Sequence, residues 1–141
     1  MIQKPIYFKL EELVPQSLFA AHKGDQDRLW WCFDPRVLWT ADKLRMLYGK
    51  MICNTWLWGG IHFERGLRLL ATKTGAVLSQ HKFGRALDLV PVDTTAEAIR
   101  QDILAHPGHD EFKFIKCLEI NIPWLHFDVR NWIGPILTFN K

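Results

Sequence analysis

The chain is organised around one ten-residue stretch, Ser79-Gln80-His81-Lys82-Phe83-Gly84-Arg85-Ala86-Leu87-Asp88. This stretch places a histidine, His81, and an aspartate, Asp88, seven positions apart with a glycine between them. Gly84 can adopt a positive φ at low cost, so the chain can fold back at this point. The sequence therefore predicts that His81 and Asp88 come together in space.

The residues around Asp88 predict a strand that begins near Ala86. Because side chains alternate along a strand, Ala86 and Asp88 would share one face, and Leu87 and Leu89 the other. A carboxylate inside such an apolar run is costly to bury unless a positive group meets it. A metal ion shared with His81 meets that need. An imidazole and a carboxylate suit zinc, which in catalytic sites takes three protein ligands and leaves a position for water.

A candidate for the third ligand lies downstream, in Trp124-Leu125-His126-Phe127-Asp128. Two motifs thus occur in order, Ser79-x-His81-x-x-Gly84-x-Ala86-x-Asp88 and then Trp124-x-His126. Together they resemble the zinc D-Ala-D-Ala carboxypeptidase and L-Ala-D-Glu endopeptidase family, which shares its metal site and core fold with the hedgehog signalling domain. The resemblance spans about residues 34–132. It implies one zinc ion bound by His81, Asp88 and His126.

The resemblance also implies a reaction, the hydrolysis of amide bonds in the stem peptides of peptidoglycan. Zinc-bound water would attack the carbonyl while a carboxylate removes its proton. Many family members carry this base three residues before the second histidine, where this chain has Pro123. Glu119, on the preceding expected strand, is the expected base, as in the hedgehog-like branch. Asp128 is the alternative.

Two further questions stay open at the level of sequence. The bond that is cut can be a terminal D-Ala-D-Ala bond or an L-Ala-D-Glu bond. The departure at Pro123 also supports a second interpretation, in which the chain is a catalytically inactive cell-wall-binding or structural module that retains the fold, with or without the zinc.

Two arginines are candidates for substrate binding. Arg65 stands fourteen residues before Ser79, the spacing of a Gly-Tyr-Arg-like motif in many family members, and Phe63-Glu64-Arg65 resembles that motif. The resemblance implies that Arg65 binds a substrate carboxylate or carbonyl oxygen, for which the planar guanidinium is suited. Arg68 is the second candidate.

Three residues are expected to support the metal ligands rather than to bind the metal. They are Ser79, Asp128 and Trp124. Asp128 would orient His126, since both lie on one strand face.

The whole chain, residues 1–141, is expected to form a single α+β domain with a central antiparallel sheet and flanking helices, similar to the hedgehog/DD-peptidase fold. Apolar patterns predict strands near 51–54, 85–92, 112–120 and 124–130. They predict helices near 35–49 and 95–105, and an earlier one over 8–22 that is interrupted or restarted at Pro15.

Several end signals accompany these helices. Asp34 and Pro35 are typical of an N-cap and first helical position, and Gly49 of a helix end. Thr94 and Glu97 are expected to form a capping box for the helix near 95–105.

Composition narrows the class of protein. Hydrophobic residues make up 48% and charged residues 23%, as in ordinary globular domains. The net charge of +3 fits an anionic partner such as a cell-wall polymer, and without clustered Lys and Arg or a recognition motif it does not indicate nucleic-acid binding. Neither a signal peptide nor an apolar run of about 18 residues is evident. We therefore expect a monomer without membrane contact, made in the cytoplasm, that reaches the cell wall if it is phage-encoded or released.

Overall fold

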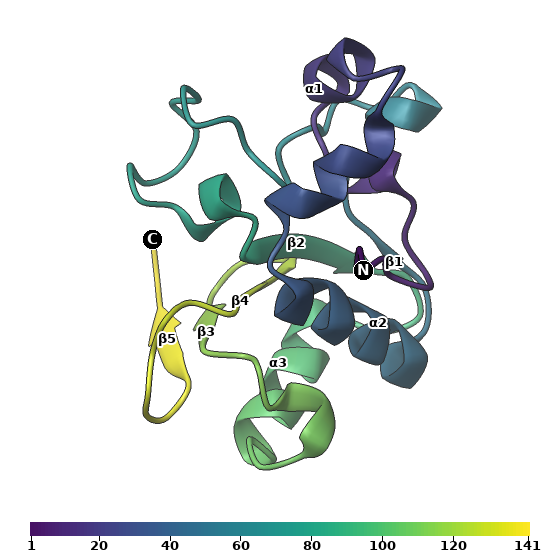
Figure 1. Cartoon of the computed structure of the whole chain (residues 1–141). Helices are drawn as coiled ribbons and strands as arrows, with labels where there is room; N and C mark the ends of the chain where they lie inside the picture. The colour runs from purple at the N-terminus through teal and green to yellow at the C-terminus, as the bar shows by residue number, and fades with distance from the viewer.

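A five-stranded mixed sheet forms the centre of the computed structural model, which describes all 141 residues (Figure 1). Its strands follow the spatial order β1-β2-β4-β3-β5. They are β1 (Met51–Ile52), β2 (Ala86–Pro91), β3 (Cys117–Glu119), β4 (Leu125–Asp128) and β5 (Leu137–Phe139). The predicted α+β class is confirmed.

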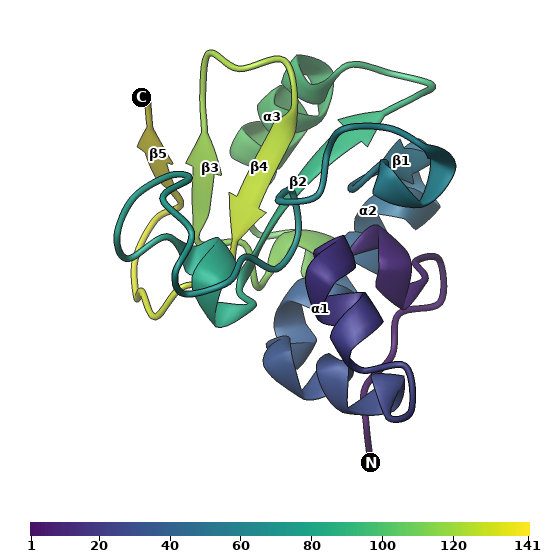
Figure 2. The same cartoon turned by 90° about the horizontal axis from the view of Figure 1, so that it is seen from above.

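Three α-helices and five 3-10 helices complete the fold. The α-helices are α1 (Gln16–Ala21), α2 (Pro35–Tyr48) and α3 (Ala96–Ala105). The 3-10 helices are Leu10–Glu12, Gln26–Cys32, Trp56–Trp58, Gln80–Phe83 and Asp110–Phe112. Helix α2 contacts β2, and α3 contacts β2 and β4, so these two helices cover one face of the central strands (Figures 1 and 2).

The alternation predicted for β2 is confirmed. Leu87 and Leu89 belong to the hydrophobic core, which they share with Leu125 and Phe127 of β4. Asp88 faces the other side of the sheet, where a cleft lies. Because the side-chain period of a strand is two residues, the apolar residues fix which face Asp88 occupies.

The prediction of an antiparallel sheet needs a correction. The pairs β1–β2, β2–β4 and β3–β4 are antiparallel, but β5, which the sequence did not predict, pairs with β3 in parallel. The reason is the path of the chain. After β4 the chain reverses direction, and β5 adds at the outer edge of β3. Strand β3 also runs antiparallel to β4, so β5 and β3 run in the same direction. The sheet is therefore mixed.

Two predicted elements are shorter than expected. The strand predicted over 112–120 covers only Cys117–Glu119, because the preceding backbone groups are used in local turns such as Phe112 N–H to His109 O and Ile115 N–H to Phe112 O. The helix predicted over 8–22 is divided at Pro15 into the 3-10 helix Leu10–Glu12 and α1.

The end signals of α2 are confirmed, and one signal of α3 is shifted. The Asp34 carboxylate accepts the backbone N–H of Arg36 at 2.9 Å, and Gly49 ends α2 with φ 87°. For α3 the N-cap is Thr95 rather than Thr94: Thr95 Oγ1 accepts the N–H of Ala98 at 3.1 Å.

The capping carboxylate of Asp34 leads to a pH prediction. Its hydrogen bond from the Arg36 side chain lowers the pKa of Asp34 below the usual value. A carboxyl group whose pKa is depressed on folding adds stability above its unfolded pKa and loses that contribution as the pH falls. Asp34→Asn keeps a capping oxygen but not the charge. Denaturant unfolding should show the variant about 0.5–1 kcal/mol less stable at pH 7. The difference should shrink as the pH falls below about 4, through the lowered pKa of folded Asp34; a difference independent of pH would contradict this role.

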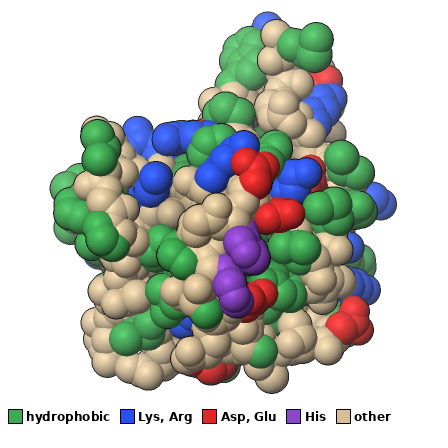
Figure 3. Space-filling view, turned by 90° about the horizontal axis from the view of Figure 1, so that it is seen from below, with side chains coloured by type: hydrophobic (Ala, Val, Ile, Leu, Met, Phe, Trp, Pro, Cys, Tyr) green, Lys and Arg blue, Asp and Glu red, His purple; other side chains and the backbone are tan.

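Two further features concern the helices and the surface charge. None of the helices combines the length and the apolar character needed to cross a membrane. On the face drawn in Figure 3, Lys and Arg side chains lie among acidic, hydrophobic and other groups rather than forming one continuous basic surface.

Candidate metal centre

His81, Asp88 and His126 meet at one point. His81 comes from the 3-10 helix Gln80–Phe83, Asp88 from β2 and His126 from β4. The Asp88 and His126 Cα atoms are partners in the β2–β4 ladder. The three residues are 2%, 6% and 6% exposed, and one possible ligand atom of each lies within 4.8 Å of the other two.

Gly84 connects the first two of these residues. It ends the 3-10 helix in the left-handed conformation, with φ 64°. A Cβ atom at this position would lie 1.8 Å from the carbonyl oxygen of Cys32. Only glycine therefore fits, and the turn directs the chain from His81 into β2 as predicted.

Hydrogen bonds fix which ring nitrogens face the centre. His81 Nδ1 lies 2.8 Å from the carbonyl oxygen of Gly66, so Nδ1–H donates there and Nε2 faces Asp88 and His126. His126 Nε2 lies 3.4 Å from Asp128 Oδ2, and its Nδ1 faces the centre. Such partners orient metal-binding histidines and fix their tautomers.

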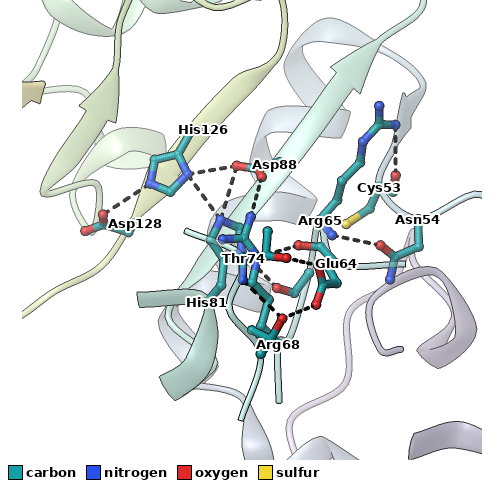
Figure 4. A network of polar contacts seen from close by, with 12 residues as sticks. Cys53, Asn54, Glu64, Arg65, Arg68, Thr74, His81, Asp88, His126 and Asp128 are labelled. Atoms are coloured by element: carbon teal, nitrogen blue, oxygen red, sulfur yellow. Dashed lines mark hydrogen bonds and ion pairs between the residues drawn. The ribbon is translucent and has the colours of Figure 1, made fainter. Parts of the chain in front are cut away.

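Asp128 is itself held in place. Arg130 donates to it from Nε at 2.7 Å and from Nη2 at 2.6 Å, a two-point ion pair. The side chain of Asp128 is fully buried. The residue therefore stands where the sequence predicted a group that orients His126 (Figure 4).

The three inward-facing atoms fit a small metal ion. His126 Nδ1 is 2.8 Å from Asp88 Oδ1, His81 Nε2 is 3.2 Å from Asp88 Oδ1, and the two nitrogens are 3.3 Å apart. A tetrahedral zinc site with ligands at about 2.0 Å has ligand-to-ligand edges of about 3.3 Å. Two imidazoles and a carboxylate are also a donor set that zinc accepts. The residues present can thus hold a metal ion with little movement.

The charges of this group favour a cation. Burial alone lowers the pKa of His126, but hydrogen bonds to Asp128 and Asp88 outweigh it and raise that pKa to about 9. Burial raises the pKa of Asp88, but the nearby His81 and His126 outweigh it and the net pKa is lowered. Positive charge is thus stabilised between Asp88 and Asp128, which is the environment that a divalent cation needs.

His81, Asp88 and His126 line a cleft of about 510 Å³. One group of lining residues, which includes Arg68, Gly75 and Ser79, comes from the segment before β2. Another comes from β3 and β5 and includes Glu119 and Phe139. The candidate metal centre is therefore open to a ligand.

Glu119 lies in this cleft beside the centre. The β3–β4 register pairs Cys117 with Asp128 and Leu118 with Phe127, and one further step brings Glu119 opposite His126. Glu119 is 5% exposed, and its Oε1 atom is buried without a hydrogen-bond partner. An unpaired buried carboxylate oxygen is costly, so this oxygen is available for a ligand in the cleft.

The two candidate arginines point in different directions (Figure 4). Arg68 lines the cleft, where its Nη2 lies 3.3 Å from Asp88 Oδ2 and its Nε donates to the carbonyl oxygen of Glu64 at 2.7 Å. The guanidinium of Arg65 instead donates to the carbonyl oxygen of Cys53 at 3.4 Å and is not part of the cleft lining. The backbone of Arg65 supports β2, since its carbonyl oxygen accepts the N–H of Asp88 at 2.8 Å.

The remaining supporting residues line the cleft without a hydrogen bond to the three candidate ligands. Ser79 and Trp124 both line it, but neither makes a hydrogen bond to His81, Asp88 or His126. Of the supporting residues named from sequence, only Asp128 contacts a member of the centre directly.

Among the cleft residues that sequence reasoning missed are Arg130, which holds Asp128 in place, and Phe139. The ring of Phe139 packs edge-on against His126, with the centroids 5.5 Å apart. It lies on β5, beyond the region that resembles the peptidase family. The apolar–polar–apolar order of Leu137, Thr138 and Phe139 would have indicated a short strand, but not its position beside His126.

Comparison of the chain with protein-family models, with curated proteins and with solved structures found no match. Functional inference therefore depends on the motifs and the geometry of this chain alone.

Proposed function

We propose that the protein is a zinc-dependent peptidase that hydrolyses amide bonds in peptidoglycan stem peptides, of the D-Ala-D-Ala carboxypeptidase or L-Ala-D-Glu endopeptidase type. On this proposal it belongs to that family and has the hedgehog/DD-peptidase fold. The observation that carries the proposal is that residues from separate motifs come together in space. Motif residues up to 45 positions apart meet as a buried His-Asp-His group in a cleft, beside a buried carboxylate that has an unpartnered oxygen.

In this proposal each residue has a separate task. His81, Asp88 and His126 hold the zinc ion, which when bound supplies a Lewis acid that acidifies water and polarises the carbonyl group to be cleaved. Glu119 accepts a proton from the attacking water on its free oxygen and returns it to the leaving amine. Asp128 keeps His126 in the tautomer whose Nδ1 faces the centre.

Arg68 is the substrate-binding arginine that the geometry favours. Its guanidinium already lies in the cleft beside Asp88, and Gly75 makes room for it there, since a Cβ atom at Gly75 would lie 2.6 Å from Nη1. A planar donor at this place suits a carbonyl or carboxylate oxygen of a peptide.

A comparison of two arginine variants tests this assignment. Arg68→Ala is expected to lower kcat/KM about 10- to 100-fold, since hydrogen bonds to charged groups contribute about 1.5–3 kcal/mol. Arg65→Ala is the matched control and should change kcat/KM less than threefold while lowering thermal stability. Steady-state kinetics on a stem peptide, with zinc content measured for each variant, checks this. The opposite order of losses would return the role to Arg65, as the family resemblance implies.

One observation favours a second candidate, an inactive wall-binding or structural module. Pro123 occupies the position at which many similar peptidases carry their base. A proline cannot accept a proton, so activity requires that another carboxylate, Glu119 or in the alternative Asp128, takes over this role.

Mass spectrometry of peptidoglycan fragments distinguishes the two candidates. Purified cell walls incubated with zinc-loaded protein should release fragments cut at an alanine–alanine or an alanine–glutamate bond, and a chelator should abolish their release. The masses identify the bond. Zinc-loaded protein that leaves walls of several types uncut would reject the peptidase and favour the inactive module.

A further inference from the structure

Two residues that line the cleft each carry a polar atom that has no partner and no task in the proposed mechanism. The two atoms are the indole Nε1 of Trp124 and the amide Oε1 of Gln80, and both are buried without a hydrogen bond. Buried polar side-chain atoms nearly always have a partner in folded proteins. Unpaired ones that line a cleft beside a reaction centre are therefore candidates for contact with a ligand.

The indole of Trp124 differs in this respect from other tryptophans of the chain. Trp56 Nε1 donates to Val14 O at 2.9 Å, and Trp132 Nε1 donates to Pro135 O at 2.8 Å. Trp124 is the one tryptophan whose N–H is buried and unpaired. An indole N–H can only donate, so the group that completes it must be an acceptor.

The position of Trp124 is fixed by its backbone. Its carbonyl oxygen accepts from Nη2 of Arg100 at 2.9 Å, and the same nitrogen donates to the carbonyl oxygen of Ile122 at 3.2 Å. Arg100 is buried in α3 and so anchors the turn before β4. Trp124 lies two residues before His126, so both side chains point to the cleft face.

Gln80 offers the complementary group. Its Nε2 donates to the carbonyl oxygen of Leu78 at 3.3 Å, which orients the amide and leaves Oε1 as a free acceptor. Its own carbonyl oxygen accepts the N–H of Arg85 at 3.0 Å, so the backbone is also held. The residue immediately precedes the ligand His81.

We infer that Trp124 and Gln80 bind the main chain of a peptide substrate, with Trp124 Nε1–H donating to a backbone carbonyl oxygen and Gln80 Oε1 accepting a backbone N–H. A peptide main chain presents one acceptor and one donor per residue, which matches this pair. The inference rests on the proposed function and deepens it. Gln80 directly precedes His81, and Trp124 lies two residues before His126 with its side chain at the same cleft. The two contacts would therefore hold the backbone close to the reacting bond whatever side chains it carries.

Nuclear magnetic resonance of the tryptophan indoles tests this directly. Zinc-loaded, ¹⁵N-labelled protein is titrated with a synthetic pentapeptide that contains an L-Ala–D-Glu bond and a D-Ala–D-Ala end. The Trp124 indole signal is assigned by its loss in Trp124→Phe. It should shift downfield as the N–H gains an acceptor, whereas the Trp56 and Trp132 signals should stay in place. A peptide-free glycan oligomer should leave the Trp124 signal unmoved.

The outcomes separate this inference from the proposed function. A Trp124 shift without cleavage would keep the main-chain contact and reject the peptidase. Cleavage, or binding seen at other cleft residues, with an unmoved Trp124 indole would overturn the contact and leave the peptidase standing. A shift with the glycan alone would overturn peptide recognition in favour of a sugar ligand. No binding and no cleavage would reject both.

Variants of the two residues give a kinetic test. A hydrogen bond with a net contribution of about 0.5–1.5 kcal/mol corresponds to roughly a 2- to 12-fold change in the affinity for the substrate. Gln80→Met keeps the side-chain length but removes the acceptor, and it should raise KM by about that factor with kcat nearly unchanged and zinc retained. Trp124→Phe should behave in the same way. Trp132→Phe, whose indole hydrogen bond lies outside the cleft, is the control. KM values equal to that control in both variants would contradict the inference.

Discussion

Glu119→Gln is expected to keep its zinc ion and to lose about 10²–10⁴-fold in the rate of peptide hydrolysis, the usual contribution of a general base. The three inward-facing ligand atoms belong to His81, Asp88 and His126, so the change leaves the centre complete. A glutamine amide fills the same space but cannot take the proton that the free oxygen of Glu119 accepts. Elemental analysis for zinc and initial rates on a stem peptide measure the two effects.

Two further variants sharpen this result. Glu11→Gln alters a half-buried glutamate outside the cleft and should leave the rate unchanged. Asp128→Asn weakens the orientation of His126 and should lower zinc affinity along with the rate. A wild-type rate for Glu119→Gln, with a large loss in Asp128→Asn at full zinc occupancy, would assign the base to Asp128 instead.

His126→Ala is expected to lose zinc and activity together. Two remaining protein ligands rarely hold zinc tightly, and the change also leaves Asp88 and Asp128 without the imidazole that lies between them. Equilibrium dialysis should therefore show less than a tenth of an equivalent of bound zinc at concentrations that saturate the wild type. Circular dichroism of the metal-free variant establishes that it is folded.

A matched histidine variant serves as the control. His109 is exposed and stacks between His106 and Phe112, away from the cleft. His109→Ala should bind one zinc ion as the wild type does. Unchanged zinc binding by His126→Ala would mean that the metal is held elsewhere.

Features that depend on a few neighbouring residues, such as turns, strand faces and helix caps, were predictable from the sequence. A glycine between a histidine and an aspartate indicated a sharp turn, and Gly84 has the positive φ that such a turn requires. The alternation of apolar residues around Asp88 predicted its face on β2, because burying Leu87 and Leu89 leaves only the opposite side for the carboxylate. The capping role of Asp34 likewise followed from one residue and its neighbours.

Relations set by tertiary structure were not predictable in the same way. The positions of Arg65 and Arg68 in the sequence do not show which side chain faces the cleft. The path of the loop decides this, because it turns the Arg68 side chain into the cleft and the Arg65 side chain towards Cys53. The addition of β5 beside β3, which brings Phe139 against His126, depends on a chain reversal that no local pattern specifies. The unpaired state of the Trp124 indole is visible only once its surroundings are known.

Anomalous X-ray diffraction at the zinc absorption edge, on crystals of the zinc-loaded protein, tests the metal centre most directly. We expect one strong peak within about 2.0–2.2 Å of His81 Nε2, His126 Nδ1 and a carboxylate oxygen of Asp88. A zinc-loaded crystal with no peak at these three side chains, or with its zinc at another group such as the exposed pair His106 and His109, would contradict the proposed centre.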